Sequence, residues 1–259
     1  MGAQNLGFRR GCRCRLVGQP YGIIQFRPCQ RLLLPAAYSF TVLSKNGFLP
    51  VILFVCFTAR AFPAYGGPAR PAIFGTLFSG LLKKAPSITP QALRTALSAL
   101  DRLEASGLRV RSDVLMVIDY TKPSTEPRLW VFDLNHTLVL FKELVAHGRN
   151  SGDNLAARFS NEPGSLMSSL GLFLTGDTYV GKHGLSLRLQ GLEKGVNDNC
   201  MERAIVIHAA NYVSPMAGRR QGRIGRSWGC PAVRPEIARQ LIETVQGGAL
   251  LFAYYPAKS

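Results

Sequence analysis

The sequence predicts a mainly β fold of the α+β class, a sandwich or barrel with a few peripheral helices. Strand-like runs separated by Gly- and Pro-containing turns fill most of residues 113–208, and clear helical periodicity is confined to 90–106 and 234–248. The 259 residues are 47% apolar and 18% charged, which suits one globular domain with a sizeable core. We therefore expect one folded domain over residues 87–256, preceded by sequence of other kinds.

The first 61 residues have the composition of a targeting region, with eight basic residues and no acidic ones. An apolar run at 47–59 follows a lysine and ends in Ala-Arg-Ala, the small-residue pattern of a signal-peptidase site. A membrane-spanning helix needs about 18 or more apolar residues, so this shorter run predicts a cleaved signal peptide over residues 42–61. Residues 1–41 show no clear periodicity and are interpreted as a disordered extension or as sequence upstream of the true translation start. We expect an exported protein of the periplasm or cell envelope that meets the membrane only transiently, through this signal.

Residues 62–86 are rich in Gly and Pro and predict a linker that packs partly on the domain. An amphipathic helix is expected over 90–106, because Thr89 suits an N-cap, Pro90 the first helical position and Gly107 the position just past the end. Its leucines recur at helical spacing, at Leu93, Leu97, Leu100 and Leu103.

The strands of the predicted sheet follow this helix. They are expected at 113–121, 128–134, 137–148, 172–180, 185–192 and 204–208. The segment LSLRLQGL at 185–192 alternates strictly, which is typical of a strand with one buried face. A second helix over 234–248 begins near Pro235 and ends at Gly247, and ALLFAYYP at 249–256 predicts a last strand.

The net charge of +16 is unevenly distributed, and the sequence after residue 61 retains 23 basic and 15 acidic residues. A moderately basic surface suits an anionic polymer or a membrane surface. The sequence has neither zinc-finger spacing nor the aromatic motif of ribonucleoprotein domains, so we expect no nucleic-acid partner. The oligomeric state is not predicted.

Cys230 and His208 form the strongest candidate for a catalytic pair. A cysteine attacks a carbonyl as its thiolate and needs a neighbouring base. His208 ends the apolar run AIVI, where the core holds a side chain that can still reach a cleft. Glycines let the following loop turn back toward that strand end, and the backbone N–H groups of Gly229 and Cys230 are expected to face a developing oxyanion. A structural thiol and a hydrogen-bonded edge histidine are the alternatives.

Two other uses of Cys230 are considered. Once the targeting region is removed, Cys200 is the other remaining cysteine, and a disulfide between the two would leave no thiol. A metal site would have to gather Cys230 with three histidines, without the short-range ligand pair that such sites usually contain. Those histidines are His147, His183 and His208. We expect neither a metal nor another cofactor.

Several motifs occur in a characteristic order. They are DYTKPSTEPRLWVFDL (119–134), VAHGRNSG (145–152), RFSNEPGSLMSSLG (158–171), YVGKHGLSLRLQGLEKGVND (179–198), IVIHAANYVSP (205–215) and GRSWGCPAV (225–233). Over about residues 109–256 the chain resembles the murein L,D-transpeptidase catalytic domain family, which is related to the YkuD-type L,D-transpeptidases of cell-wall synthesis.

The resemblance implies a β-sandwich-like catalytic domain that acts on peptidoglycan stem peptides. By it, Cys230 matches the nucleophile, His208 the base, and Ser227 and Gly229 the turn beside the cysteine. The implied reaction is attack on the bond between the third residue, diaminopimelate, and D-Ala of a stem tetrapeptide. The acyl group then passes to an amine in transpeptidation or to water in carboxypeptidation.

The chain departs from the usual YkuD-type motif at two positions. Trp228 replaces the histidine of Ser-His-Gly-Cys, and Ala232 stands where those enzymes have an arginine. His208 is therefore expected to perform the acid–base work alone or with another group. Arg226 or Arg234 is a candidate for the missing cation. Trp228 is interpreted either as an apolar wall for the stem peptide or as a core anchor of the turn.

Further candidate substrate-binding residues lie in Gly-flanked turns, at His147, Ser151 and His183, where they either line the cleft or hold loops in place. Arginines before the cysteine form a cationic loop that either receives stem carboxylates or is simply solvated. They are Arg219, Arg220, Arg223 and Arg226. An alternative function is that of a catalytically weak or inactive wall-binding module of the same fold.

Overall fold

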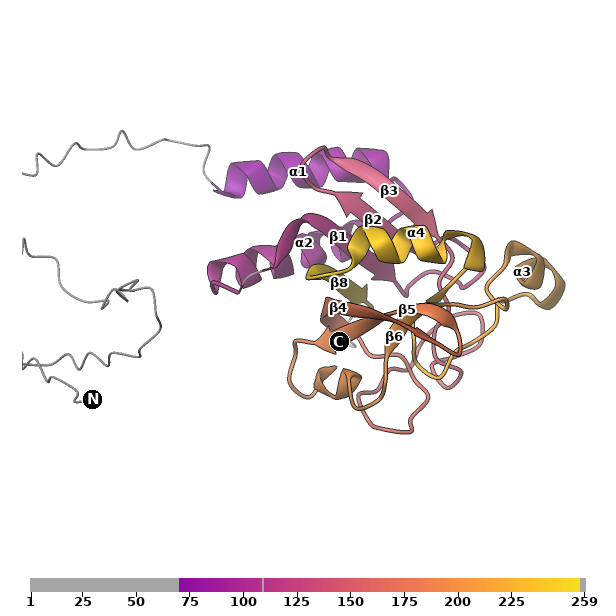
Figure 1. The fold of residues 1–259 in the computed structure, drawn as a ribbon. Coiled ribbons are helices and arrows are strands. Elements are labelled where there is room, and N and C mark those ends of the chain that lie inside the picture. The colour runs from indigo at the N-terminus through magenta and orange to yellow at the C-terminus, as the bar shows by residue number, and fades with distance from the viewer. Residues whose placement is uncertain (1–69, 109, 257–259) are drawn as a thin grey trace, which may run out of the picture. The chain divides into compact units, whose positions relative to one another are not determined.

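A computed structural model describes residues 70–108 and 110–256 (Figure 1). The expected extension at 1–41 and the signal peptide at 42–61 lie outside these residues. The elements are α1 (Arg70–Lys84), α2 (Pro90–Ala105), β1 (Arg111–Asp119), β2 (Leu129–Asp133), β3 (Leu138–Glu143), β4 (Gly171–Gly181), β5 (Gly184–Gly191), the 3₁₀ turn η1 (Asp198–Cys200), β6 (Val206–Ala209), α3 (Pro215–Gln221), β7 (Ala232–Val233), α4 (Pro235–Val245) and β8 (Ala249–Tyr254).

The strands form one eight-stranded mixed sheet in the order β3-β2-β1-β8-β4-β5-β6-β7. The pairs β1–β8 and β6–β7 are parallel, and the other pairs are antiparallel. The segment that follows β3 runs beside β7, where the Ala146 N–H donates to Ala232 O at 2.9 Å and Gly148 bridges Ser227. This contact nearly closes the sheet, and the predicted mainly β class with peripheral helices is confirmed.

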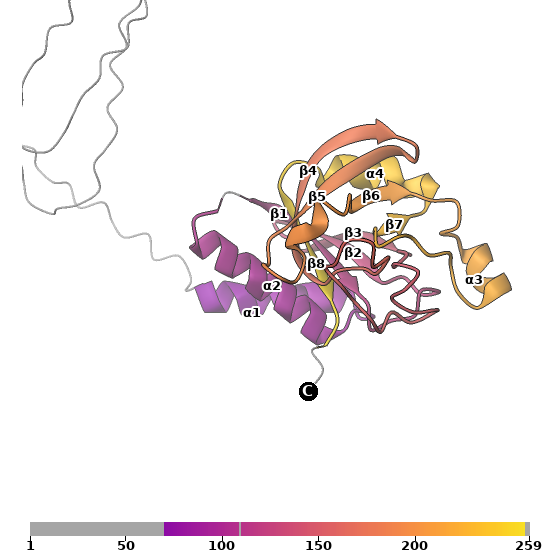
Figure 2. The same cartoon turned by 90° about the horizontal axis from the view of Figure 1, so that it is seen from below.

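Both faces of the central strands are covered. In β1, Leu115 and Val117 pack against α1 and α2, whereas Met116 and Ile118 face a second cluster that includes α4 and strands β5 and β6. Figure 2 shows α1 and α2 together on one side of the domain, with α4 and the β4–β5 hairpin on the other. Burial of both faces explains why β1 reads as a continuous apolar run rather than as an alternation.

Within the segment expected to be a linker, 62–86, residues 70–84 form helix α1. Three of its four prolines lie at or before position 71 and the fourth is Pro86, so the sequence between them can continue a helix through to Lys84. Partly buried Phe78 and fully buried Leu81 pack in the same cluster as α2. Burial of this apolar face outweighs the glycines that favoured a linker, and residues 62–69 lie outside the described chain.

The helix predicted at 90–106 is present as α2 and begins at Pro90. Thr89 occupies the N-cap position without a side-chain cap. Its hydroxyl instead lies 3.2 Å from the Thr121 hydroxyl, and its N–H donates to Asp119 Oδ2 at 3.0 Å, which ties the helix start to the end of β1. The later helix α4 begins at Pro235 as predicted. The short elements α3 and β7 were not predicted.

Candidate active site

The parallel pair β6–β7 brings the segment of Cys230 beside the strand that carries His208. The register pairs His208 with Ala232, and Cys230 lies two positions before Ala232. The backbone N–H of Val206, also in β6, lies close enough to the Cys230 sulfur to lower the pKa of the thiol. The register therefore places a thiol and an imidazole at one edge of the sheet.

The Cys230 thiol is partly covered, and its Sγ lies 3.7 Å from Ala204 O. Burial raises the pKa of the thiol above its ordinary value. The Val206 N–H and the positive charges of Arg203 and Lys182 lower that pKa, but the effect of burial is larger. The thiol is therefore neutral at rest and needs a base to become a nucleophile.

The second cysteine of the domain is not bonded to the first. Cys200 and Cys230 are both free thiols in the part of the chain that the structure describes. Cys200 is fully buried, and its Sγ lies 3.2 Å from Leu189 O. Burial raises the pKa of Cys200 to about 12. The disulfide considered from the sequence is therefore wrong, and Cys200 stays a protonated core thiol.

His208 is held in the orientation of a base. Its Nδ1 lies 2.8 Å from Ala209 O, and a carbonyl oxygen only accepts, so Nδ1 carries the hydrogen. This tautomer leaves the lone pair on Nε2. Burial is the main cause that lowers the pKa of His208, and the charges of His183 and Lys182 lower it further. The imidazole is therefore neutral and able to accept a proton near neutral pH.

The tip of the β4–β5 hairpin lies over this base. The rings of His183 and His208 are stacked, with their centroids 4.4 Å apart and an interplanar angle of 25°. Lys182 reaches across to the next turn, where its Nζ lies 5.7 Å from the centroid of the Trp228 ring. Trp228 is 67% exposed, so the interpretation of this residue as a core anchor is wrong. An aromatic surface and two polar side chains thus border the thiol–imidazole pair.

The turn around Cys230 is built on Gly229, whose φ is +124°. A Cβ at this position would lie 2.7 Å from Met167 O, so only glycine fits. The Gly229 N–H donates to Ser227 Oγ at 3.1 Å, and that hydroxyl donates to Cys230 O at 2.7 Å. Within the described chain, the Cys230 N–H donates to no backbone or side-chain acceptor outside its own residue. This N–H faces the sulfur of the same residue and is free to bind a substrate oxygen.

Arg203 is a residue of the site that the sequence reasoning missed. Its guanidinium would lie 3.1 Å from a Cβ at Gly229, and its charge lowers the pKa of Cys230. It binds four acceptors in the segment before β4, namely Ser160 O, Ser165 Oγ, Met167 O and Ser169 Oγ. Arg203 precedes β6 by three positions, but the pairing of β6 with β7 that puts it beside the cysteine is not visible in the sequence.

The arginines proposed as a replacement for the missing cation have other partners. Arg226 donates to Gly152 O at 2.9 Å and lies 3.4 Å from Asp153 Oδ1. Arg234 forms a two-pronged ion pair with Glu143, at 2.7 and 2.8 Å. Both guanidinium groups hold loops and strands of the domain together.

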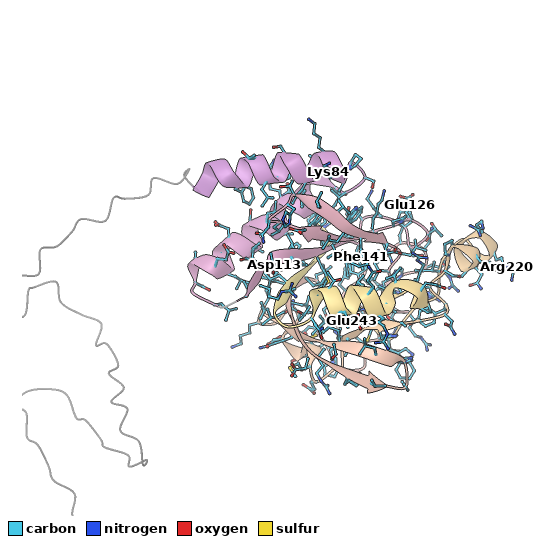
Figure 3. All side chains as sticks on the ribbon, turned by 45° about the horizontal axis from the view of Figure 1, so that its top comes forward. Lys84, Asp113, Glu126, Phe141, Arg220 and Glu243 are labelled. Atoms are coloured by element: carbon cyan, nitrogen blue, oxygen red, sulfur yellow. The ribbon has the colours of Figure 1, made fainter. Side chains whose placement is uncertain are left out.

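The cationic loop expected before the cysteine is divided between two places. Arg223 lies 2.8 Å from Asp153 Oδ1, so its charge is paired on the surface of the domain. Arg219 and Arg220 belong to α3. Figure 3 shows Arg220 at the outer end of the domain, on the helix that protrudes from it.

His147 and Ser151 are fully buried and lie under the cysteine turn. The Arg128 guanidinium donates to His147 Nδ1 at 2.7 Å, so the hydrogen of this ring is on Nε2, which lies 3.4 Å from Gly152 O. Burial and the charge of Arg128 lower the pKa of His147 to about 4. The backbone of His147 contacts the turn directly, because the Ser227 N–H donates to His147 O at 3.0 Å. Their burial leaves neither side chain exposed to a ligand.

Among residues 70–108 and 110–256, no three side chains of His, Cys, Asp or Glu gather in a way that could hold a metal ion. No helix in the same residues has both the length and the apolar character that crossing a membrane requires.

One family model and several solved structures are similar to this chain. The family model described as the L,D-transpeptidase catalytic domain (YkuD_2) matches residues 84–254. An L,D-transpeptidase from Mycobacterium smegmatis is similar at 16% identity and a TM-score of 0.34, over 55% of this chain and 59% of that one. The helical cell shape determining protein Pgp2 from Campylobacter jejuni is similar at 14% identity and a TM-score of 0.39, over 58% of this chain and 50% of that one. No curated protein sequence matches the chain significantly.

The family model covers well over half of the sequence, and the chain therefore belongs to the L,D-transpeptidase catalytic domain family. The chain spans less than two thirds of the length of the solved structures that it resembles.

Proposed function

We propose that the protein is a peptidoglycan L,D-transpeptidase or L,D-carboxypeptidase that uses Cys230 as nucleophile and His208 as base. The observation that carries this proposal is the bond from His208 Nδ1–H to Ala209 O, at 2.8 Å. It leaves the lone pair of a neutral imidazole on Nε2, in a strand whose partner β7 begins two residues after Cys230. The substrate class follows from membership of the L,D-transpeptidase catalytic domain family.

The acylation step follows from this arrangement. His208 Nε2 takes the proton from the Cys230 thiol, and the sulfur forms a bond to the carbonyl carbon that precedes D-Ala in the stem peptide. The Cys230 N–H binds the resulting oxyanion. The carbon–nitrogen bond to D-Ala then breaks, and the leaving amine takes the proton from the His208 imidazolium. A thioester and free D-Ala are the products of this step.

In the deacylation step a new nucleophile attacks the thioester, and the bond to the Cys230 sulfur breaks. An amine of a second stem peptide, or water, attacks the thioester carbon while His208 Nε2 accepts its proton. The carbon–sulfur bond breaks, and the departing thiolate takes that proton back. Because the raised pKa of Cys230 and the lowered pKa of His208 both favour the neutral pair, the proton moves during attack rather than before it.

The cleft around this pair suits a peptide with charged ends. Trp228 offers an exposed apolar surface, and Lys182 beside it offers a cation for a carboxylate of the stem. His183 completes the rim over the base. We assign His147, Ser151 and Arg226 to the support of the loops beneath the cleft, because their hydrogen bonds are made within the protein.

The site of action is proposed to be the cell envelope, where the stem peptides of peptidoglycan lie. Members of the family act on this polymer, and the expected signal peptide over residues 42–61 would deliver the protein there by export. Sequencing the N-terminus of the protein recovered from cells tests this part of the proposal. A mature protein that still begins within residues 1–41 contradicts cleavage after residue 61.

The enzymatic proposal is tested with a disaccharide tetrapeptide and mass spectrometry. We expect loss of D-Ala with water as acceptor and a cross-linked product with a second stem as acceptor. Cys230→Ala abolishes both products, whereas the matched thiol control Cys200→Ala retains them, because Cys200 is a fully buried core thiol whose pKa is raised to about 12. Full activity of Cys230→Ala would overturn the assignment. Binding of the wild-type protein to purified sacculi, with neither product nor labelling of Cys230 by a carbapenem, would instead identify a wall-binding module.

A further inference from the structure

The serine-rich segment that precedes β4 lies under the cysteine turn, although it contributes no group to the proposed chemistry. Ser168 is 1% exposed, and its hydroxyl donates to Gly229 O at 3.2 Å. The same oxygen accepts the Gly148 N–H at 3.0 Å. Ser168 Oγ has one hydrogen, which it donates to Gly229 O, and the same hydroxyl also forms a hydrogen bond with the Tyr120 side chain.

The position of Ser168 is itself determined by its neighbours. Its N–H donates to Ser151 Oγ at 2.9 Å, and Ser151 is fully buried. Gly148, which donates to the hydroxyl, also bridges Ser227 in the cysteine turn. The hydroxyl of Ser168 is therefore held between two segments that are far apart in the sequence, and its one proton is aimed at one carbonyl.

That carbonyl belongs to the peptide between Gly229 and Cys230. The peptide bonds of the described residues are all trans, so the Cys230 N–H points away from the side to which Gly229 O points. Gly229 O is directed at buried Ser168. The Cys230 N–H is therefore directed the opposite way, toward the partly exposed sulfur of its own residue.

Glycine at position 229 makes this peptide plane easy to rotate. This plane rotates about ψ of Gly229 and φ of Cys230, and glycine, which has no Cβ, tolerates a wide range of ψ. A rotation of the plane would turn the N–H into the protein and the carbonyl oxygen, which repels an oxyanion, toward the cleft. A contact that binds Gly229 O is thus needed to keep the donor in place.

We propose that Ser168 is a positioning residue that holds the Gly229–Cys230 peptide with its N–H facing the cleft, as the donor for the oxyanion. The inference rests on the proposed function, in which that N–H stabilises the tetrahedral intermediate. Ser168 touches neither the substrate nor the reacting atoms. Its effect is specific to reactions that develop negative charge on a carbonyl oxygen.

The test compares two reactions of the same sulfur in the full-length protein. Acylation by a carbapenem passes through an oxyanion, whereas alkylation by iodoacetamide does not. We expect Ser168→Ala to slow the acylation about 10- to 100-fold and to leave the alkylation rate within about twofold. Thr175→Val is the matched control, because the Thr175 hydroxyl is also buried, donates to a backbone carbonyl, Val245 O, and accepts a backbone N–H, that of Gly248, without contacting the cysteine turn. It should leave both rates unchanged, and a thermal melt checks that both variants fold.

Equal loss of both rates in Ser168→Ala, or no loss of either, would overturn the role of Ser168. If the wild-type protein is not acylated at all, the proposed function fails. The positioning role of Ser168 is then tested by crystallography instead. A crystal structure of Ser168→Ala should then show the Gly229–Cys230 peptide rotated or in two orientations. An unchanged single orientation of Gly229 O in that variant contradicts the inference.

Discussion

The imidazole of His183, at the tip of the β4–β5 hairpin, lies stacked on the imidazole of His208, with 4.4 Å between the ring centroids. This contact covers one side of the proposed base and places a second titratable group against it. The two residues come from different strands, and the pairing of Ser186 with His208 in the sheet brings the hairpin tip over the base. Water is thereby kept from one face of the ring, while the Nδ1–H bond to Ala209 O sets its orientation.

The stacked pair predicts the pH dependence of the reaction. A positive charge on His183 disfavours protonation of His208 and so lowers the pKa of His208, in addition to the effect of burial. Because His183→Ala removes both the charge and the covering ring, the pKa of His208 rises and the acid limb of kcat/KM moves to higher pH. His183→Phe keeps the ring and removes the charge, so we expect a smaller shift in the same direction. A pH–rate profile that is identical in all three proteins would contradict the coupling.

We expect Cys230 to react as a thiol that is protonated in the free protein. Burial raises the pKa of this residue, so the rate of alkylation by iodoacetamide should still be rising with pH above the ordinary cysteine value of about 8.5. Arg203→Gln removes a charge that lowers this pKa, and its alkylation curve should lie at still higher pH. The measurement is the rate of alkylation of each protein against pH. A plateau already reached at pH 6 in wild-type protein would show a thiolate–imidazolium pair instead.

Gly229→Ala tests the steric requirement of the turn. The φ of +124° and the approach to Met167 O both disfavour a Cβ there, so we expect a loss of about 2 kcal/mol or more in the free energy of unfolding. Activity should be lost as well, because the turn carries Cys230. Gly195→Ala is the matched control, since Gly195 has a φ of +76° but no atom within 4 Å of a new Cβ. It should cost about 1 kcal/mol and retain activity, as measured by denaturant unfolding and D-Ala release.

His147 makes folding stability depend on pH. Its pKa is lowered to about 4 in the folded protein, against about 6.5 when unfolded. Between these values the unfolded chain binds the proton and the folded protein does not, so acid favours unfolding. The stabilisation is complete above pH 6.5, and up to about 3 kcal/mol of it is lost by pH 4. His147→Gln should lack this component in denaturant titrations at pH 7, 5.5 and 4, and a pH dependence equal to that of the wild type would contradict the assignment.

Trp228 is predicted to contribute to substrate binding with little effect on stability. Its side chain is 67% exposed, so Trp228→Ala should change the free energy of unfolding by no more than about 0.5 kcal/mol. Loss of the aromatic surface next to Lys182 should raise KM about tenfold, equivalent to about 1.4 kcal/mol. Trp228→Phe should retain most of the affinity. A large loss of stability in Trp228→Ala would mean that the indole anchors the turn after all.

Much of the domain could be predicted from local pattern. The strand-like runs at 113–121 and 185–192 correspond to β1 and β5, and the caps and periodicity of 90–106 correspond to α2. Cys230 and His208 could be named because a glycine-rich turn and the end of a strand are features of neighbouring residues. The helix α1 was missed, since its glycines suggested a linker and its stability comes from packing on α2.

The partners of the candidate site could not be read in the same way. The sequence does not reveal that His208 in β6 pairs with Ala232 in β7, nor that Arg203 lies next to Gly229. It also left open whether His147 lines the cleft or holds a loop in place, and the structure covers its side chain completely. Each of these facts depends on contacts between segments that are separated by many residues.

The amino-acid order determined which residues have the chemistry for a thiol nucleophile and a base, and which segments extend or coil. The periodicity of apolar residues and the turn-forming residues act over a few positions, so both can be recognised in the sequence. Only the tertiary structure decided which side chains meet, which are buried, and toward which side the Cys230 N–H points. These properties follow from sheet register and close packing, where a shift of one residue reverses the face of every side chain in a strand.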